Sequence, residues 1–270
     1  MLKQRILTAL WLLPLALLGF FYLEGIFFAL FIGAVITLGA WEWAALAGIK
    51  AQDVRVAYAA LVAVLMSLLY LLPSLAKPII YLATVWWIAA IVMVLTFPKS
   101  TVAWGGSLGS LLIGLLVLVP AWQGLVLLKQ MPQANWLILA VMLMVWMADI
   151  GAYFVGKAIG KRKLAPQVSP GKSWEGAIGG LVISVAVVIS YALWRDLAIA
   201  SLPVMILGAA IVVAISIIGD LTESMFKRHS GIKDSSNLLP GHGGILDRVD
   251  SITSAVPVFV LLLVLAGWGA

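Results

Sequence analysis

Residues 106–128 read GSLGSLLIGLLVLVPAWQGLVLL, which is 23 positions without a charged side chain. A helix needs about 20 consecutive apolar residues to cross the hydrocarbon core of a bilayer. Pro120 does not argue against a helix, because neighbouring helices can satisfy the carbonyl group that a proline leaves free. The stretch therefore predicts a transmembrane helix.

The whole chain has the same apolar character. Of its 270 residues, 64% are hydrophobic and 10% are charged, against roughly 45–50% and about 25% in soluble domains. A single core of this size could not hide so much apolar surface from water. The composition predicts a membrane protein, and the absence of cysteine excludes disulfide scaffolds, thiolate zinc sites and cysteine nucleophiles.

We expect an all-α, polytopic bundle of about nine transmembrane helices. They are predicted at residues 5–21, 27–47, 57–73, 78–97, 106–128, 135–156, 176–194, 203–219 and 253–269. The first follows Lys3 and Arg5 as a signal peptide would, but no small-x-small cleavage site comes after it. The half at 1–130 (spans one to five), which is nearly all compatible with hydrocarbon, is expected to be membrane helices alone, and the half at 131–270 (spans six to nine) to carry the chemistry.

Basic residues predict the orientation. With the N-terminus in the cytoplasm, fourteen of the 17 Lys and Arg residues fall in cytoplasmic segments, and Lys77, Lys129 and Arg195 fall outside. The positive-inside rule therefore favours an N-in/C-out protein. The net charge of +6 then reflects topology in a lipid bilayer, and no nucleic-acid partner is expected.

One carboxylate lies inside a predicted span. Asp149 is about two turns, roughly 10 Å, from the cytoplasmic end of the sixth span. Burying a charge there costs about 2.5–3.5 kcal/mol on insertion scales, which indicates an ion pair with a neighbouring helix or a polar pocket. Tyr153 and Gly156 continue the same helical stripe.

The densest set of ionisable residues lies between 220 and 250. If the eighth helix continues past the membrane edge, Asp220, Glu223 and Lys227 share one face with Ser224. Asp247 and Asp250 share a face at the start of the ninth helix. Carboxylates that converge from two helices would repel one another unless a cation lay between them, and Mg²⁺ is the simplest hard cation with oxygen ligands.

A glycine-rich turn stands just before the ninth helix. Gly241, Gly243 and Gly244 surround His242 and free the backbone amides to face an anion. A basic cluster of Lys227, Arg228, Lys233 and Arg248 lies in the same region. Carboxylates, glycines and basic groups together indicate a nucleotide or polyphosphate site.

Read continuously, residues 224–250 resemble the signature of the phosphatidate cytidylyltransferase family. The pattern Ser-x-hydrophobic-Lys-Arg, four residues, Lys-Asp, then Pro-x-His-Gly-Gly-hydrophobic-x-Asp-Arg-hydrophobic-Asp is filled at every defined position. The blocks 149–153 and 169–176 are similar to further family blocks, so the resemblance covers about the second half of the chain. It implies an enzyme that converts CTP and phosphatidate into CDP-diacylglycerol and pyrophosphate with magnesium.

With this reaction, we assign roles to the polar residues. We expect Asp220 and Asp247 to hold magnesium, with Asp250 and Asp149 as additional or outer ligands. The remaining groups are predicted to bind the triphosphate, the ribose or the lipid headgroup, namely Lys172, Ser173, Glu175, Ser224, Lys227, Arg228, Lys233, Asp234, Gly243, Gly244 and Arg248.

Two assignments keep an alternative, and one histidine is given no role. His242 is expected to bind a phosphate or protonate the leaving group, or else to stabilise the turn. Ser173 can equally cap the seventh helix as line the headgroup site. His229 is expected to be a spectator.

Two other functions are compatible with parts of the sequence. A CTP-dependent lipid kinase acting on a polyprenol-type alcohol would release CDP in place of pyrophosphate. A secondary transporter would use Asp149 as an ion site, although the polar residues gather at one face of the membrane and not at its midplane. Small-residue helix faces are compatible with a homodimer, and the expected location is the bacterial inner membrane with the site facing the cytoplasm.

Overall fold

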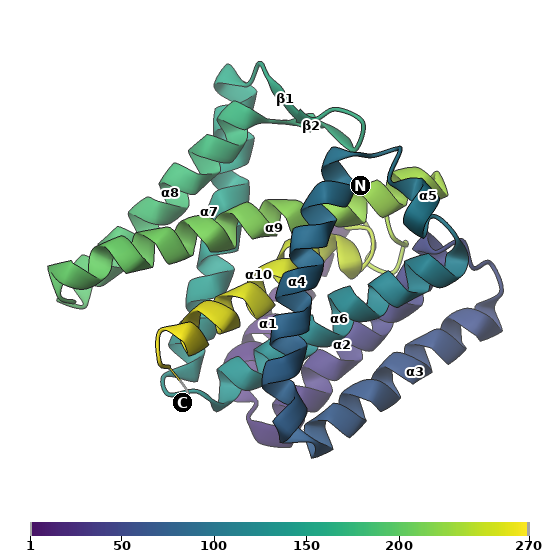
Figure 1. Ribbon diagram of the computed structural model, residues 1–270, viewed down its shortest axis with the longest axis horizontal. Coiled ribbons are helices and arrows are strands. Elements are labelled where there is room, and N and C mark those ends of the chain that lie inside the picture. The colour runs from purple at the N-terminus through teal and green to yellow at the C-terminus, as the bar shows by residue number, and fades with distance from the viewer. Residues whose placement is uncertain (1, 269–270) are drawn as a thin grey trace.

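The computed structural model describes residues 2–268, and these fold into a bundle of helices with one short β-hairpin (Figure 1). The first half contains α1 (Leu2–Leu17), a π-helical turn η1 (Leu18–Tyr22), α2 (Gly25–Leu46), α3 (Gln52–Leu71), η2 (Pro73–Leu75), α4 (Ala76–Leu95), α5 (Thr101–Trp104) and α6 (Ser107–Gln130). The second half contains α7 (Ala134–Ile159), β1 (Lys163–Ala165), β2 (Ser169–Ser173), α8 (Trp174–Trp194), η3 (Ile199–Ser201), α9 (Leu202–Ser230) and α10 (Leu246–Leu265).

Among the described residues, eight helices are long and apolar enough to cross a membrane. They correspond to predicted spans two to nine. The first predicted span falls on α1 and η1, where the apolar helix Leu10–Tyr22 is shorter than the other spans. The expectation of an all-α polytopic membrane protein is confirmed.

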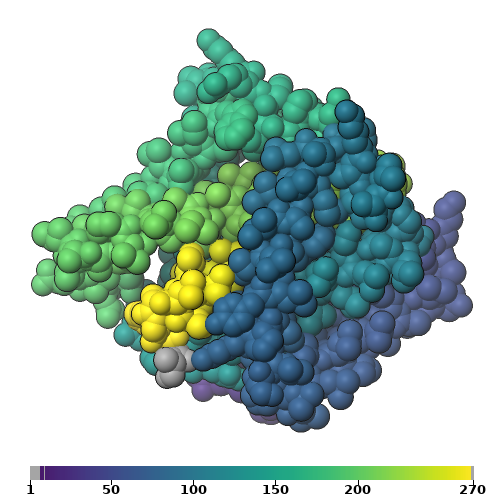
Figure 2. Space-filling view, in the orientation of Figure 1, coloured from purple at the N-terminus to yellow at the C-terminus, as the bar shows by residue number. Residues whose placement is uncertain are grey.

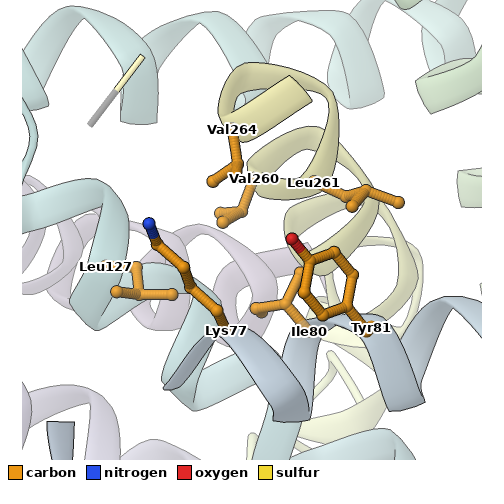
Figure 3. Close-up of a pocket in the computed structure, with 7 residues that line it drawn as sticks. All are labelled: Lys77, Ile80, Tyr81, Leu127, Val260, Leu261 and Val264. Atoms are coloured by element: carbon orange, nitrogen blue, oxygen red, sulfur yellow. The ribbon is translucent and has the colours of Figure 1, made fainter. Parts of the chain in front are cut away.

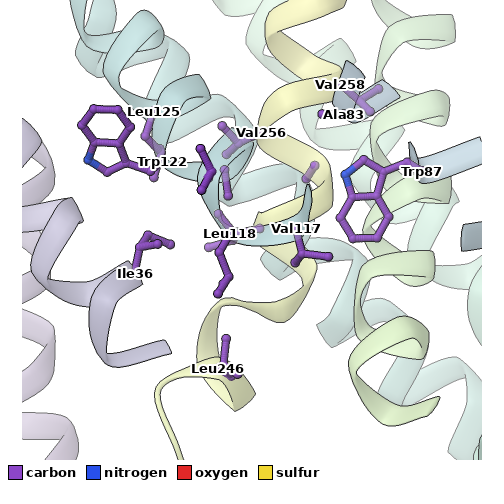
Figure 4. Packing of buried hydrophobic residues seen from close by; sticks show 14 of the residues in the cluster. Ile36, Ala83, Trp87, Val117, Leu118, Trp122, Leu125, Leu246, Val256 and Val258 are labelled. Carbon is purple, nitrogen blue, oxygen red and sulfur yellow. The ribbon is translucent and has the colours of Figure 1, made fainter. Parts of the chain in front are cut away.

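Helix α6, which contains the stretch quoted first, lies at the centre of the first half. It packs against α2, α4 and α10, and Figure 4 shows its Val117, Leu118 and Trp122 among side chains of those helices. Leu118 is fully buried and Trp122 donates from Nε1 to the Ala29 carbonyl oxygen of α2 at 2.9 Å. Most of this apolar helix is buried among its neighbours, and its exposed Leu108 and Leu112 lie near its start.

The outer faces of the bundle are apolar too. Helix α4 runs across the front of Figure 2 and exposes Val85, Ile88 and Val92, which are 65%, 61% and 59% exposed. A continuous apolar face of this kind would aggregate in water and is stable against lipid tails. The exposed side chains therefore support a position within a membrane.

Helices α7 and α8 form a closely packed pair at one side of the bundle (Figure 1). Their contact needs glycine, since a Cβ on Gly180 would overlap the Ala148 carbonyl oxygen and a Cβ on Gly151 would lie 2.9 Å from the Gly180 Cα. Small residues allow membrane helices to approach each other this closely. Gly156 likewise faces the start of α8, where a Cβ would lie 3.2 Å from Ser173 Oγ.

The second half contains one hairpin that the sequence did not predict, and two helices that extend beyond the predicted apolar spans, as the spacing of their charged residues indicated. Residues 163–173, expected as a connection, form an antiparallel hairpin in which Lys163 pairs with Ser173 and Ala165 with Ser169. Helix α9 continues to Ser230, past the predicted end at residue 219, and α10 begins at Leu246, ahead of the predicted residue 253. Both extensions carry the charged residues that a search for apolar runs leaves out.

Candidate active site

Polar side chains from α7, β2, α9 and α10 converge at one end of the bundle. Lys172 of β2 forms an ion pair with Asp220 of α9, with 2.6 Å between Nζ and Oδ2. Asp149 of α7 lies within electrostatic range of both groups, and Ser224 donates to Asp220 Oδ1 at 3.2 Å. The carboxylate that the sequence singled out in α7 therefore lies near Lys172 and Asp220.

Lys227 lies deeper, between two carboxylates of different helices. Its Nζ is 2.7 Å from Asp247 Oδ1 and 3.3 Å from Glu223 Oε1, and its side chain is 12% exposed. An ammonium that is largely removed from water stays charged only where carboxylates balance it. Lys227 thus joins the end of α9 to the start of α10.

Asp247 accepts more hydrogen bonds than any other carboxylate of the predicted set. Its Oδ2 accepts hydrogen bonds from the Ser235 amide at 3.0 Å, the Ser235 hydroxyl at 3.0 Å and the Gly244 amide at 2.7 Å. A Cβ on Gly243 would come within 2.7 Å of this oxygen, and Gly243 has a φ of 84° that favours glycine. The Gly244 amide, predicted to face a phosphate, is directed here at Asp247.

Glu223 was placed on the α9 face by the sequence but was given no role. It is 3% exposed, and neither of its carboxylate oxygens accepts a hydrogen bond within the part of the chain that the structure describes. The Asp250 carboxylate is its neighbour, and both residues line a small cavity together with Trp87. Glu223 therefore places a second buried carboxyl group next to Lys227.

The hairpin is held by contacts that sequence reasoning assigned in part to substrate. Ser173 Oγ accepts from the Gly176 amide at 3.1 Å and so caps α8. Glu175 accepts from the Lys161 and Arg162 amides at 3.1 and 3.2 Å. Arg228 donates from Nε to the Val168 carbonyl oxygen at 3.1 Å, which ties α9 to the hairpin turn.

The loop between α9 and α10 carries the other predicted binding residues. Lys233 and Asp234 are exposed on it. Arg248 donates from Nη2 to the His242 carbonyl oxygen at 2.7 Å, while His242 Nδ1 is buried without a hydrogen-bond partner among the described residues. His229, expected to be a spectator, is 2.9 Å from the Gly105 carbonyl oxygen through Nε2 and lies edge-on to Trp104.

The acidic residues of the site can be compared with the ligands that Mg²⁺ uses in proteins. The carboxyl groups of Asp149, Asp220, Glu223, Asp247 and Asp250 outnumber the ammonium groups of Lys172 and Lys227 by three. Within residues 2–268, however, no three acidic or histidine side chains are close enough to hold an ion by themselves. Mg²⁺ commonly binds one or two carboxylates together with phosphate oxygens of a substrate. The donor set fits an ion of that kind.

One buried carboxylate of the first half reaches this region, and sequence reasoning missed it. Glu42 of α2 is 0% exposed and hydrogen-bonded to the loop that precedes α10. A signal was present, because Glu42 is the one charged residue between 25 and 46 and a charge within a membrane span is expensive. The same argument identified Asp149.

A second cavity lies far from these groups. It opens between α4, α6 and α10 and is lined by Lys77, Tyr81 and five aliphatic side chains (Figure 3). Its Val264 is about 25 Å along α10 from Asp247 at 1.5 Å per residue. This cavity is therefore at the other end of the bundle and is separate from the convergent polar residues.

The whole chain is similar to known proteins. Residues 3–266 match the cytidylyltransferase family. A phosphatidate cytidylyltransferase of Pseudomonas aeruginosa is 67% identical over 270 residues, covering 100% of both chains. One from Haemophilus influenzae is 41% identical and covers 96% of this chain and 97% of its own, and one from Bacillus subtilis is 46% identical over 45% of each chain.

Proposed function

The chain belongs to the cytidylyltransferase family, and we propose that it makes CDP-diacylglycerol from CTP and phosphatidate among the converging residues of α7, β2, α9 and α10. The observation that carries this location is Lys227, which is held between carboxylates of α9 and α10 at an end of the bundle. A water-soluble nucleotide can reach such an end while a lipid substrate keeps its acyl chains within the membrane. The chain is a multi-pass membrane protein, and we place the site on the cytoplasmic side of the bacterial inner membrane, where CTP is present.

The reaction needs charge stabilisation more than it needs a base. An oxygen of the phosphatidate monoester attacks the α-phosphorus of CTP, the bond from that phosphorus to the bridging oxygen breaks, and pyrophosphate leaves. The attacking oxygen is already ionised near neutral pH. Two polyanions must nevertheless approach each other, so the barrier is largely electrostatic.

The basic residues are placed to offset this repulsion. Lys172 and Lys227 are each bound to a carboxylate, which holds the two ammonium groups at fixed positions. Arg228, Lys233 and Arg248 are exposed around them, and we assign them to the phosphate groups of the two substrates. Glu175 and Ser173 support this arrangement by holding the hairpin and the start of α8.

We further propose that Asp220 and Asp247 hold Mg²⁺, with Asp149 and Asp250 close to them. When bound, the ion would neutralise negative charge on the triphosphate and on the departing pyrophosphate. The excess of carboxylates over lysines in the site supports this proposal. It also accounts for acidic residues in a site whose substrates are anions.

The test is a product analysis with purified protein in detergent micelles. CTP labelled at the α-phosphorus is supplied with phosphatidate and Mg²⁺, and the label should enter the lipid phase with one pyrophosphate released per lipid labelled. Diacylglycerol in place of phosphatidate is the control, because it lacks the attacking phosphate and should give no labelled lipid. Label that remains in water as CDP would indicate a lipid kinase and overturn the assignment.

A further inference from the structure

Glu42 is a buried carboxylate of the first half whose hydrogen bonds all go to the segment beside Asp247. Its Oε1 accepts from the Ser236 hydroxyl and from the Ile245 amide at 3.0 Å. Its Oε2 accepts from the Ser235 hydroxyl at 3.1 Å and from the Leu246 amide at 2.8 Å. Four donors from residues about 200 positions away in sequence thus meet one side chain of α2.

These bonds place Glu42 at the N-terminus of α10. The first amides of a helix lack partners within the helix, and here no side chain of α10 caps them. Glu42 satisfies two of these amides from another helix, and its charge faces the positive end of the α10 dipole. A phosphate group cannot use the Ile245 and Leu246 amides, because they already donate to Glu42.

Ser235 connects Glu42 to the proposed active site. Its hydroxyl lies 3.1 Å from Glu42 Oε2 and 3.0 Å from Asp247 Oδ2, and its amide donates to the same Asp247 oxygen. Asp247 in turn accepts from Lys227 through Oδ1. Gly244 packs directly against both side chains: a Cβ at this position would overlap the Ser235 hydroxyl and lie 2.5 Å from Glu42 Oε1. A continuous path of polar contacts therefore runs from α2 to α9.

We propose that Glu42 is a positioning residue for catalysis, which fixes the loop before α10 so that Asp247 keeps Oδ1 directed at Lys227. Glu42 is already engaged within the protein: Oε1 accepts two hydrogen bonds, and Oε2 accepts one from the Leu246 amide and shares the single Ser235 hydroxyl proton with Asp247. The inference rests on the proposed site, since it needs Asp247 and Lys227 to act in the reaction. It assigns a role in that site to the otherwise apolar half of the chain.

The decisive variant is Glu42→Gln, which keeps the size of the side chain. Its amide group has one oxygen for four donors, so two N–H or O–H groups would face the NH₂ group without an acceptor. We expect kcat to fall at least tenfold while the KM for CTP changes less than threefold, because the nucleotide does not touch Glu42. Glu42→Asp should also fail to restore kcat, since the shorter side chain cannot reach both the loop and the helix.

The control removes a buried hydrogen bond elsewhere in the first half. Tyr58 donates to the Leu111 carbonyl oxygen at 2.8 Å, far from the loop in sequence. Tyr58→Phe should lower the melting temperature in detergent without changing kcat. Comparing it with Glu42→Gln at equal folded protein separates a loss of stability from a loss of positioning.

A double-mutant cycle tests the path through Ser235. If Glu42 acts on Asp247 through this serine, the effects of Glu42→Gln and Ser235→Ala on kcat will be less than additive, whereas Glu42→Gln and Tyr58→Phe will combine additively. Wild-type kcat in Glu42→Gln, or strict additivity with Ser235→Ala, would overturn the inference. Should the wild-type protein make no CDP-diacylglycerol, the proposed function itself would fail, so the two failures are distinguishable.

Discussion

The two oxygens of Asp247 have different partners. One oxygen holds the loop before α10, and the other bonds to Lys227 of the proposed active site. Oδ2 accepts three hydrogen bonds from Ser235 and Gly244, which hold the loop. Oδ1 accepts from Lys227. An asparagine could keep its oxygen toward the loop and place its NH₂ group toward Lys227, so the loop would survive while the negative charge is lost.

Asp247→Asn should therefore lower kcat/KM at least tenfold, about 1.4 kcal/mol, and should also lower the melting temperature, because Lys227 loses its acceptor at 2.7 Å. The measurement is CDP-diacylglycerol synthesis over a range of Mg²⁺ concentrations. Asp53→Asn is the matched control, because Asp53 lies exposed in the first turn of α3 and should leave the kinetics unchanged. Near-normal turnover in Asp247→Asn would remove Asp247 from the reaction.

At the scale of elements, the sequence predicted the helices and the residues that share a helix face, because both depend on the spacing of residues close together in the chain. Apolar runs located the membrane helices, and the spacing of Asp220, Glu223 and Lys227 placed them on one face of a continued helix. The contacts of Glu42 were beyond such reasoning, because its partners Ser235 and Leu246 are 193 and 204 residues away. The hairpin was missed for another reason: strand β1 has three residues, which are too few to give an alternating pattern.

Helix α8 illustrates how geometry separates two interpretations that sequence left open. Ser173 accepts a hydrogen bond from the Gly176 amide at 3.1 Å and is 7% exposed, while the adjacent Lys172 pairs with Asp220. A buried cap has little access to a lipid headgroup. The contacts therefore favour the capping role for Ser173 and leave the binding role to its neighbour.

Ser173→Ala should destabilise the protein by about 0.5–2 kcal/mol, the usual cost of losing an N-cap. We expect a lower melting temperature and a KM for phosphatidate within twofold of the wild-type value. Ser190→Ala is the comparison, because Ser190 bonds to the Ala186 carbonyl oxygen within α8 and caps nothing. A raised KM with an unchanged melting temperature would return Ser173 to the headgroup site.

At the scale of the whole molecule, contacts between distant turns define two ends of the bundle. At one end Thr8 donates to the Pro240 carbonyl oxygen at 2.9 Å and His229 bonds to Gly105, beside the convergent carboxylates. At the other end Lys129 donates to the Phe20 carbonyl oxygen at 3.0 Å. The first end holds connecting segments that are rich in Lys and Arg, and the second holds Lys129, one of the three basic residues predicted to lie outside. The positive-inside rule therefore predicts that the first end is cytoplasmic.

The natural absence of cysteine makes this orientation testable, since the unmodified chain gives no background with a membrane-impermeant maleimide. Gly171→Cys places a thiol on the exposed hairpin, where a Cβ meets nothing within 4 Å. Ser74→Cys places one in the exposed turn between α3 and α4. We expect Ser74→Cys to be labelled in intact spheroplasts and Gly171→Cys only in inside-out vesicles. The reverse pattern would put the carboxylates on the side of the membrane that lacks CTP, and the proposed location of the reaction would be wrong.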